Sequence, residues 1–261
     1  MTPTTIAEAY SQTGAAWQAG PGAIYDRLAT VLVDGAPSDL RDRLVLDLGA
    51  GTGAASRAIS AVGGIPVALD AAFGMLATDR TRRPAAVVGD ACALPLRDRA
   101  VEAVVAAFSL NHLDDPVAGL REAARVTRRG GALLASAYAE DDTHPVKDAA
   151  EAAARAHGWE PPPWYPQMRA VAVPKLATVE RAQAALAAAG LRGDARALRV
   201  AFPELGPEQL LAWRFGMAQL APFVATLTTD ARATMMRRAR LLLDDSQQLV
   251  RSIIVIVATA C

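Results

Sequence analysis

Short apolar runs alternate with amphipathic segments through the first half of the chain. Runs typical of buried strands occupy residues 44–48, 66–70, 85–89, 101–108 and 132–138. Apolar positions spaced to cover one helix face predict helices over residues 54–63, 75–81 and 117–126, and the sequence Arg-Gly-Gly predicts a turn at 129–131. This alternation predicts a parallel sheet with right-handed crossovers. The run 101–108 is almost wholly apolar, which predicts a central strand.

The two ends of the chain follow a different pattern. Residues 5–34 have helical periodicity with an interruption near 20–22. After about residue 140, helices are predicted over 145–157, 179–189, 207–220 and 229–245, and strands over 194–202 and 251–259. The segment 159–166 (WEPPPWYP) is expected to be neither helix nor central strand, because prolines break both.

These patterns predict a single α/β domain with three parts. Residues 1–39 form an N-terminal helical cap, and residues 40–140 form the core of the sheet. Residues 141–261 supply the last strands and a helical lid, the lid being made of residues 140–175 and 204–246. A chain of 261 residues is long enough for this arrangement.

Composition and charge exclude several classes of partner. The 27 basic and 27 acidic residues cancel, which leaves no electrostatic footprint for nucleic acid or an anionic membrane. No apolar run approaches the roughly 20 residues of a membrane span, and the first residues lack the pattern of a secretory signal. With only Cys92 and Cys261, no disulfide framework is indicated. A cytoplasmic protein without nucleic-acid or membrane partners is therefore expected, and its oligomeric state is left open.

The segment 45–53 reads V-L-D-L-G-A-G-T-G, a buried strand that leads through a glycine turn into a helix. Its glycines remove each Cβ where a ligand must lie against the backbone. Acids recur at the strand ends: Asp47, Asp70 and Asp90. They predict a pocket at the carboxyl edge of the sheet, where Asp70 is placed to hold a ribose diol. Asp47 beside the loop suits a positively charged ligand better than a pyrophosphate.

Together these segments resemble the class I S-adenosylmethionine-dependent methyltransferases, of the small-molecule type found in ubiquinone and menaquinone biosynthesis. The resemblance covers about residues 40–140 and rests on VLDLGAGTG (45–53), ALD (68–70), VVGDACALPLRD (87–98), VVAAFSLNHLDDP (104–116) and RVTRRGGALLASAY (125–138). It implies a Rossmann-like, seven-stranded, mostly parallel sheet between helices, with the last strand antiparallel beside strand five. It also implies S-adenosylmethionine as cofactor and S-adenosylhomocysteine as its product.

The resemblance also implies roles for individual residues. The methionine part would lie against the loop and the segment after strand four, at Asp47, Gly49, Ala50, Gly51, Gly53, Phe108 and Ser109. The nucleoside would be held by Asp70 and Ala71 at the ribose, and by Met75, Asp90 and Ala91 at the adenine. Tyr10 and Trp17 would close over the cofactor from the N-terminal helices.

The acceptor side is less determined by the sequence. His112 is the candidate catalytic residue, since a histidine can take a proton near neutral pH, and its alternative role is to cap the turn before Asp114. Tyr25, Trp159, Trp164 and Tyr165 are candidate substrate contacts, and the last three could equally pack the lid. No metal-ligand spacing of the zinc type is present.

The predicted function is methylation of O, N or C on a small, rather apolar metabolite, in the context of secondary metabolism. The segment F-S-L-N-H-L after strand four differs from the N-P-P-Y type of nucleic-acid enzymes, which argues against DNA or RNA. Two alternatives remain open: a cyclase or pericyclase on the same scaffold that keeps the cofactor without methyl transfer, and a cofactor-binding regulator without turnover.

Overall fold

A seven-stranded sheet forms the centre of the protein, whose computed structural model describes residues 5–244 and 248–260. The strands are β1 (Leu44–Leu48), β2 (Ile65–Asp70), β3 (Ala86–Val88), β4 (Val101–Ala107), β5 (Thr127–Tyr138), β6 (Arg192–Phe202) and β7 (Leu249–Thr259). They lie in the order β3-β2-β1-β4-β5-β7-β6, with β7 antiparallel to both of its neighbours and the other strands parallel. The predicted fold class and the antiparallel last strand are confirmed, and β4 lies at the centre as expected.

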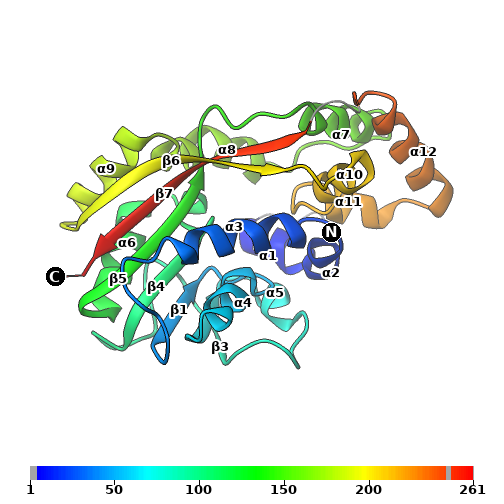
Figure 1. Ribbon diagram of the computed structural model, residues 1–261. Coiled ribbons are helices and arrows are strands. Elements are labelled where there is room, and N and C mark those ends of the chain that lie inside the picture. The colour runs from blue at the N-terminus through cyan, green and yellow to red at the C-terminus, as the bar shows by residue number, and fades with distance from the viewer. Residues whose placement is uncertain (1–4, 245–247, 261) are drawn as a thin grey trace.

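Helices cover both faces of this sheet (Figure 1). On one face lie α3 (Gly22–Asp34) and α4 (Ala54–Ala61), and on the other α6 (Pro116–Val126) and α9 (Val179–Ala188). Alternate residues of β4 supply the two cores, because side chains alternate across a strand: Val105 faces α3, and Val104 faces α6. The helix α3 buries Ile24, Leu28 and Leu32, whose spacing of four keeps them on one face.

The remaining helices lie around the edge of the sheet where the parallel strands end. The N-terminal helices are α1 (Ile6–Ser11) and α2 (Gly14–Ala19), and α5 (Phe73–Ala77) follows β2. The other elements are α7 (Pro145–Arg155), α8 (Trp164–Val171), α10 (Pro207–Phe215), α11 (Ala221–Thr226), α12 (Thr229–Arg240) and the 3-10 turns η1 (Leu110–His112) and η2 (Val173–Leu176). Figure 1 shows α7, α10, α11 and α12 gathered beyond the last residues of β6 and the first residues of β7. Among the described residues, none of the helices combines the length and apolar character needed to cross a bilayer.

The predicted turn at 129–131 is wrong, because these residues belong to β5. Gly130 takes a left-handed φ of 75°, and the pairing of β5 with β4 shifts register there, which is the geometry of a bulge. The Gly130 N–H donates to the carbonyl of Ala260, 2.8 Å away. A partner 130 residues distant in sequence therefore keeps the segment in the sheet.

The prediction of no helix in 159–166 is also wrong in part, since α8 begins at Trp164. Pro166 lies in the first turn, where a missing N–H costs no hydrogen bond. Several boundaries shifted as well: the predicted helix 207–220 ends at Phe215, and α11 follows as a separate helix. The predicted helix 229–245 ends at Arg240, and its last residue lies outside the described part of the chain, as do residues 1–4 of the predicted cap and 245–246 of the predicted lid.

Two glycines allow the N-terminal helices to lie close against α5. The Gly74 N–H donates to the Ser11 hydroxyl at 3.3 Å, and a Cβ on Gly74 would lie 1.9 Å from the Ser11 carbonyl oxygen. A Cβ on Gly14 would lie 1.9 Å from Oγ1 of Thr78. The close approach of α1 and α2 to α5 therefore depends on the absence of side chains at these positions.

We expect Gly74→Ala to lower the free energy of unfolding by about 1–3 kcal/mol, because the clash is with backbone that cannot rotate away. Urea denaturation followed by circular dichroism measures this change. Gly22→Ala is the matched control, since it also lies in the first turn of a helix and its Cβ would meet the Trp17 carbonyl at an ordinary 3.4 Å. Equal stability of the two variants would show that the close contact of α1 with α5 is not maintained in solution.

Candidate functional site

A cavity of about 260 Å³ opens where the sheet order reverses between β1 and β4. The chain leaves β1 toward β2 on one side and leaves β4 toward β5 on the other, so the loops that follow β1 and β4 diverge. In doubly wound sheets this divergence at the carboxyl ends of the strands creates the ligand crevice. The cavity lies at that place, under the N-terminal helices.

The loop after β1 presents bare main chain to the cavity. Gly49 and Gly51 line it with positive φ angles of 74° and 54°, which favour glycine. A Cβ on Gly49 would lie 2.2 Å from Cβ of Ser109, so no other residue fits without moving the loop after β4. The N–H groups of Gly49 and Ala50 donate to the Leu69 carbonyl at 2.7 and 2.9 Å, which holds the loop against β2.

Asp70, the last residue of β2, is held by the backbone on both oxygens. Its Oδ2 accepts the Gly51 N–H and its Oδ1 accepts the Ala72 N–H, each at 2.7 Å. Burial raises the pKa of Asp70, and these two hydrogen bonds oppose the shift. A carboxylate offers about four lone-pair positions, so two remain for donors that enter the cavity. The geometry suits a pair of adjacent hydroxyl groups.

Asp47 is a buried carboxylate on the cavity wall. It is 1% exposed, and its Oδ2 accepts the Ser56 hydroxyl at 2.6 Å. Burial raises its pKa to about 6, although the Ser56 bonds oppose the shift. Among the described residues no cation forms an ion pair with Asp47. Its charge is therefore costly in the unliganded protein and would be offset by a cationic ligand.

The segment after β4 closes the other side of the cavity in a constrained conformation. Phe108 has a φ of 56°, unusual for a residue with a bulky side chain, and its N–H donates to the Ser136 carbonyl at 3.1 Å. The Ser109 hydroxyl donates to the Leu48 carbonyl at 2.6 Å. These bonds tie the ends of β1, β4 and β5 together at the cavity.

His112 lies in η1 and also lines the cavity, where its Nε2 is 3.1 Å from the Tyr10 hydroxyl. Burial lowers the pKa of His112 and raises that of Tyr10, so both are neutral near pH 7. The direction of their hydrogen bond follows the tautomer of the imidazole: the tyrosine donates when the ring proton is on Nδ1. The capping role considered for His112 belongs to Asp115, whose carboxylate accepts the Ala118 N–H at 3.0 Å at the start of α6.

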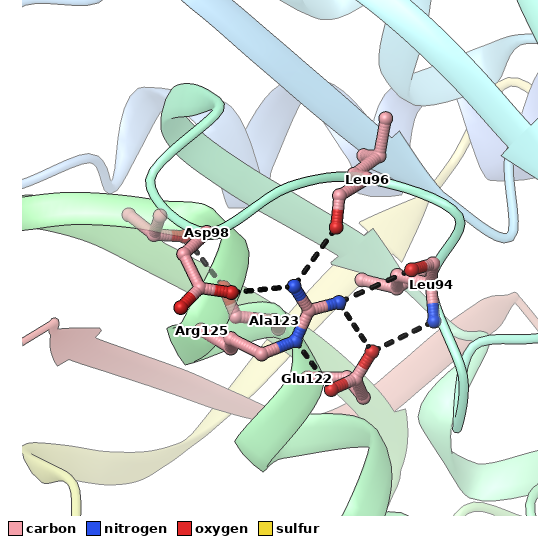
Figure 2. Close-up of polar contacts among 7 residues, drawn as sticks. Leu94, Leu96, Asp98, Glu122, Ala123 and Arg125 are labelled. Carbon is pink, nitrogen blue, oxygen red and sulfur yellow. Dashed lines mark hydrogen bonds and ion pairs between the residues drawn. The ribbon is translucent and has the colours of Figure 1, made fainter.

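The loop after β3 is held in place by Arg125 of α6 (Figure 2). The Arg125 guanidinium donates to the carbonyls of Leu94 and Leu96, at 3.1 and 2.8 Å, and to Asp98 at 2.8 Å. Glu122 accepts both the Leu94 N–H and the guanidinium at 2.7 Å, and the guanidinium lowers the pKa of this carboxyl group. The loop that carries Asp90 and Ala91 is thereby fixed beside the cavity.

Aromatic rings form the wall between the cavity and the helices above it. The ring of Tyr10 lies 5.5 Å from that of Trp17, which lies 4.7 Å from that of Tyr25. Tyr25 in turn makes an edge contact with Phe108 at 5.5 Å. The separations are those of favourable aromatic pairs. A ligand here would be shielded from water by α1, α2 and α3.

The structure brings nearly all the predicted cofactor contacts to this cavity. Those that line it are Tyr10, Trp17, Asp47, Gly49, Ala50, Gly51, Asp70, Ala71, Met75, Asp90, Ala91, Phe108 and Ser109, and the candidates His112 and Tyr25 line it as well. Gly53 is the exception. It begins α4 with a φ of 91° and lies on a neighbouring groove beside Arg57.

Three predicted substrate contacts lie away from the cavity. The Trp159 indole donates to the Gln219 carbonyl at 3.0 Å, and Trp164 packs with Ala9 and Ala218. The Tyr165 hydroxyl donates to Glu151 at 3.0 Å. Their contacts are those of residues that pack the surrounding helices, which was the alternative to substrate binding.

Sequence reasoning missed residues that support the site. Ser56 holds Asp47, and Arg125 holds the loop that carries Asp90. Neither residue lines the cavity. A polar residue on the buried face of the helix after the glycine loop was an available signal for Ser56. The other missed residues that line the cavity are mostly apolar and include Ala7, Thr52, Leu69, Ala72 and Leu113. Such residues carry no sequence signal.

Comparisons with known proteins agree with the resemblance seen in the sequence. A family model described as "Methyltransferase domain" matches residues 46–135. The chain is 38% identical over 129 residues to a demethylmenaquinone methyltransferase of Mycobacterium sp. (strain KMS), an alignment that covers 49% of this chain and 54% of the relative. The chain thus matches about half the length of that relative. The expected resemblance to class I S-adenosylmethionine-dependent methyltransferases is confirmed for this segment.

Solved structures share the fold over more of the chain. The complex of the Haloferax volcanii Trm112 methyltransferase activator with its putative methyltransferase matches with a TM-score of 0.60 at 18% identity, covering 99% of both chains. The [4+2]-cyclase SpnF matches with a TM-score of 0.53 at 20% identity, covering 90% of this chain and 80% of that one. At such identities the likeness shows the fold alone.

The buried charge of Asp47 leads to a prediction about stability and pH. The folded chain keeps the Asp47 proton up to about pH 6, whereas an unfolded aspartate loses it near pH ~3.9. The buried Asp47 therefore lowers the free energy of unfolding progressively as the pH rises between these values, and by its full amount above both. We expect Asp47→Asn to stabilise the unliganded protein by about 1–3 kcal/mol at pH 8, with a smaller gain at pH 5.

Urea denaturation of both proteins at the two pH values measures the effect. Asp34→Asn, at the exposed end of α3, is the control and should show no such difference. A gain for Asp47→Asn that is the same at pH 5 and pH 8 would contradict the assigned cost of the buried charge.

Proposed function

We propose that this protein transfers a methyl group from S-adenosylmethionine to a small, rather apolar metabolite. The observation that carries the proposal is the convergence of three features on one cavity: the bare glycine loop, the doubly held Asp70 and the buried Asp47, which forms no ion pair with any described residue. The methyltransferase domain matched at 46–135 contains all three. For the whole protein, the activity, the acceptor and the small-molecule partner are what we propose.

The residues that line the cavity fit each part of the cofactor: the methionine part, the ribose and the adenine. Asp47 would pair with the ammonium of its methionine part, which lies against the main chain of Gly49 and Gly51. Asp70 would accept the two ribose hydroxyls through its remaining lone pairs. Met75 and the loop at Asp90 and Ala91 would contact the adenine. This assignment explains why a costly charge is retained at Asp47, because a bound cation would offset it.

The chemistry supplied by the bound cofactor is an electrophilic methyl group on a sulfonium. The protein's part is to position the acceptor and to exclude water. Phe108 and Ser109 are held rigidly after β4, and the aromatic wall of Trp17 and Tyr25 shields the cavity. Bringing the nucleophile to near-attack distance in a dry site supports a reaction in which a charge on the donor disappears.

His112 and Tyr10 would remove the acceptor's proton when its nucleophile carries one. In the tautomer with its proton on Nδ1, neutral His112 would accept a proton at Nε2, directly or through the Tyr10 hydroxyl 3.1 Å away. Both groups line the cavity. The pair would thus act as a base next to the site of methyl transfer.

A small apolar acceptor agrees with the aromatic wall and with the relative that is named for demethylmenaquinone. The helices α7, α8 and α10 to α12 would form a lid over the acceptor. The cyclase alternative rests on a fold likeness alone. Release of S-adenosylhomocysteine with a methyl acceptor distinguishes the reactions, since cyclisation on this scaffold would release none.

The cofactor assignment is tested by the variant Asp70→Ala. It removes the acceptor of two hydroxyls and the anchor of the glycine loop, so we expect S-adenosylhomocysteine to bind at least tenfold more weakly. Isothermal titration calorimetry gives the affinities, with Asp34→Ala as the control that should match the wild type. Unchanged affinity of Asp70→Ala, or no binding by the wild-type protein, would refute the proposed cofactor site.

The catalytic assignment is tested by His112→Ala. We expect turnover with an acceptor found by screening to fall by roughly 10²-fold or more, measured as S-adenosylhomocysteine released. Cofactor affinity should stay within about twofold of the wild type, since the imidazole is assigned to the proton and not to the cofactor. Full turnover in the variant would leave His112 without a role in proton transfer.

A further inference from the structure

A second polar cluster lies buried beyond the aromatic wall, on the face of the sheet that carries α3. We call it the arginine cluster, and its members are Tyr138, Asp142, Lys147, Glu151, Trp213, Arg214 and Arg251. Arg251 is 2% exposed and Arg214 is 5% exposed. Neither was singled out in the sequence, although Arg251 is a charge near the start of an otherwise apolar strand.

Cations in this cluster outnumber the carboxylates that balance them. Asp142 accepts from Arg251 Nε and Nη2, at 2.9 and 2.6 Å, and from Lys147 Nζ at 2.8 Å. It also accepts the Ser252 N–H at 3.0 Å, so its lone pairs are used. One carboxylate therefore serves two cations. Burial and the neighbouring Arg251 lower the pKa of Lys147 to about 8, in keeping with crowded positive charge.

Arg214 is paired more weakly. Its Nη2 lies 3.6 Å from Glu151, which is too far for a hydrogen bond, and Glu151 already accepts the Tyr165 hydroxyl. The other Glu151 oxygen lies 4.0 Å from Arg155. Three cations at the cluster thus share two carboxylates, one of which also faces the exposed Arg155.

Donors of the cluster also lack acceptors. Among the described residues, none accepts a hydrogen bond from Arg251 Nη1 or Arg214 Nε, although both atoms are buried. A buried donor without a partner costs about 1–3 kcal/mol, more for a charged group. Excess positive charge and free donors in one place are the features of a site for an anion.

The cluster adjoins the cavity through stacked rings. The Arg251 guanidinium lies 4.0 Å from the ring centre of Tyr138 and 4.5 Å from that of Trp213, so two aromatic rings flank it. Tyr138 stacks on Phe108 at 4.5 Å and meets the edge of Tyr25 at 6.3 Å. Phe108 and Tyr25 both line the cavity. The rings of Tyr25 and Tyr138 are therefore what separates Arg251 from the methyl-transfer site.

We propose that the arginine cluster recognises a carboxylate on the methyl acceptor, with Arg251 Nη1 and Arg214 Nε as donors. This inference rests on the proposed function, since it names the acceptor class of the same site. The apolar part of the acceptor would displace the Tyr25 and Tyr138 rings and lie against Phe108. Its carboxylate would balance the excess cation and its nucleophile would face the donor side of the cavity.

The test compares carboxylates with their neutral amides on the intact protein saturated with S-adenosylhomocysteine. The probes are 1-hydroxy-2-naphthoate against 1-hydroxy-2-naphthamide, and 4-phenylbutyrate against 4-phenylbutyramide, titrated by calorimetry. We expect the carboxylate of at least one pair to bind at least tenfold more tightly than its amide. Equal affinities within both pairs, or no binding of either carboxylate, would overturn the proposal.

A single variant assigns the preference to the cluster. Arg251→Gln removes the excess cation and one of the two donors, and Asp142 keeps Lys147 as its partner, so no buried charge is left alone. It should lose the preference for the carboxylate and keep its affinity for S-adenosylhomocysteine. Arg199→Gln is the matched control, an exposed arginine of β6 opposite Ser252, and should keep the preference. An Arg251→Gln protein that still prefers the carboxylate would overturn the assignment.

If thermal melting shows that Arg251→Gln does not fold, Arg214→Gln replaces it and should reduce the preference severalfold; an unchanged preference there counts against the cluster. The two proposals fail separately. A wild-type protein that does not bind S-adenosylhomocysteine contradicts the proposed function, and with it the acceptor site. Binding of S-adenosylhomocysteine without any carboxylate preference contradicts the acceptor site alone.

Discussion

The site depends first on the pair of hydrogen bonds that Asp70 accepts from the backbone of Gly51 and Ala72. These bonds connect the end of β2 to the glycine loop of β1 and to the start of α5. The loop can lie there only because Gly49 and Gly51 lack side chains. The carboxylate therefore shapes the cavity before any ligand enters it, and the same oxygens keep lone pairs free toward the cavity.

Buried charge of opposite sign lies on the two sides of the aromatic wall. Asp47 leaves a negative charge without an ion-pair partner among the described residues on the loop side, and the arginine cluster leaves an excess positive charge beyond Tyr25 and Tyr138. Each costs free energy in the unliganded chain. A cationic group at the first and an anionic group at the second would offset these costs. The proposals for donor and acceptor follow from that distribution of charge.

The local pattern of apolar residues predicted most strands of the sheet. The central strands β1 and β4 were recognised because they are buried on both faces and nearly all their residues are apolar. One error fell where a distant part of the chain overrides local preference: Gly130 stays in β5 because it pairs with Ala260. The other was local, since α8 begins within the proline-rich segment with a proline in its first turn, where no hydrogen bond is lost.

The sequence by itself determined the order of the elements and the residues of the glycine loop with its acids, because spacing along the chain sets which strand ends share an edge. Only the tertiary structure decided which side chains meet across that edge. The contact of Tyr10 with His112 spans 102 residues and that of Arg251 with Asp142 spans 109. Such contacts depend on how helices pack over the sheet, and packing of distant segments leaves no periodic signal in the sequence.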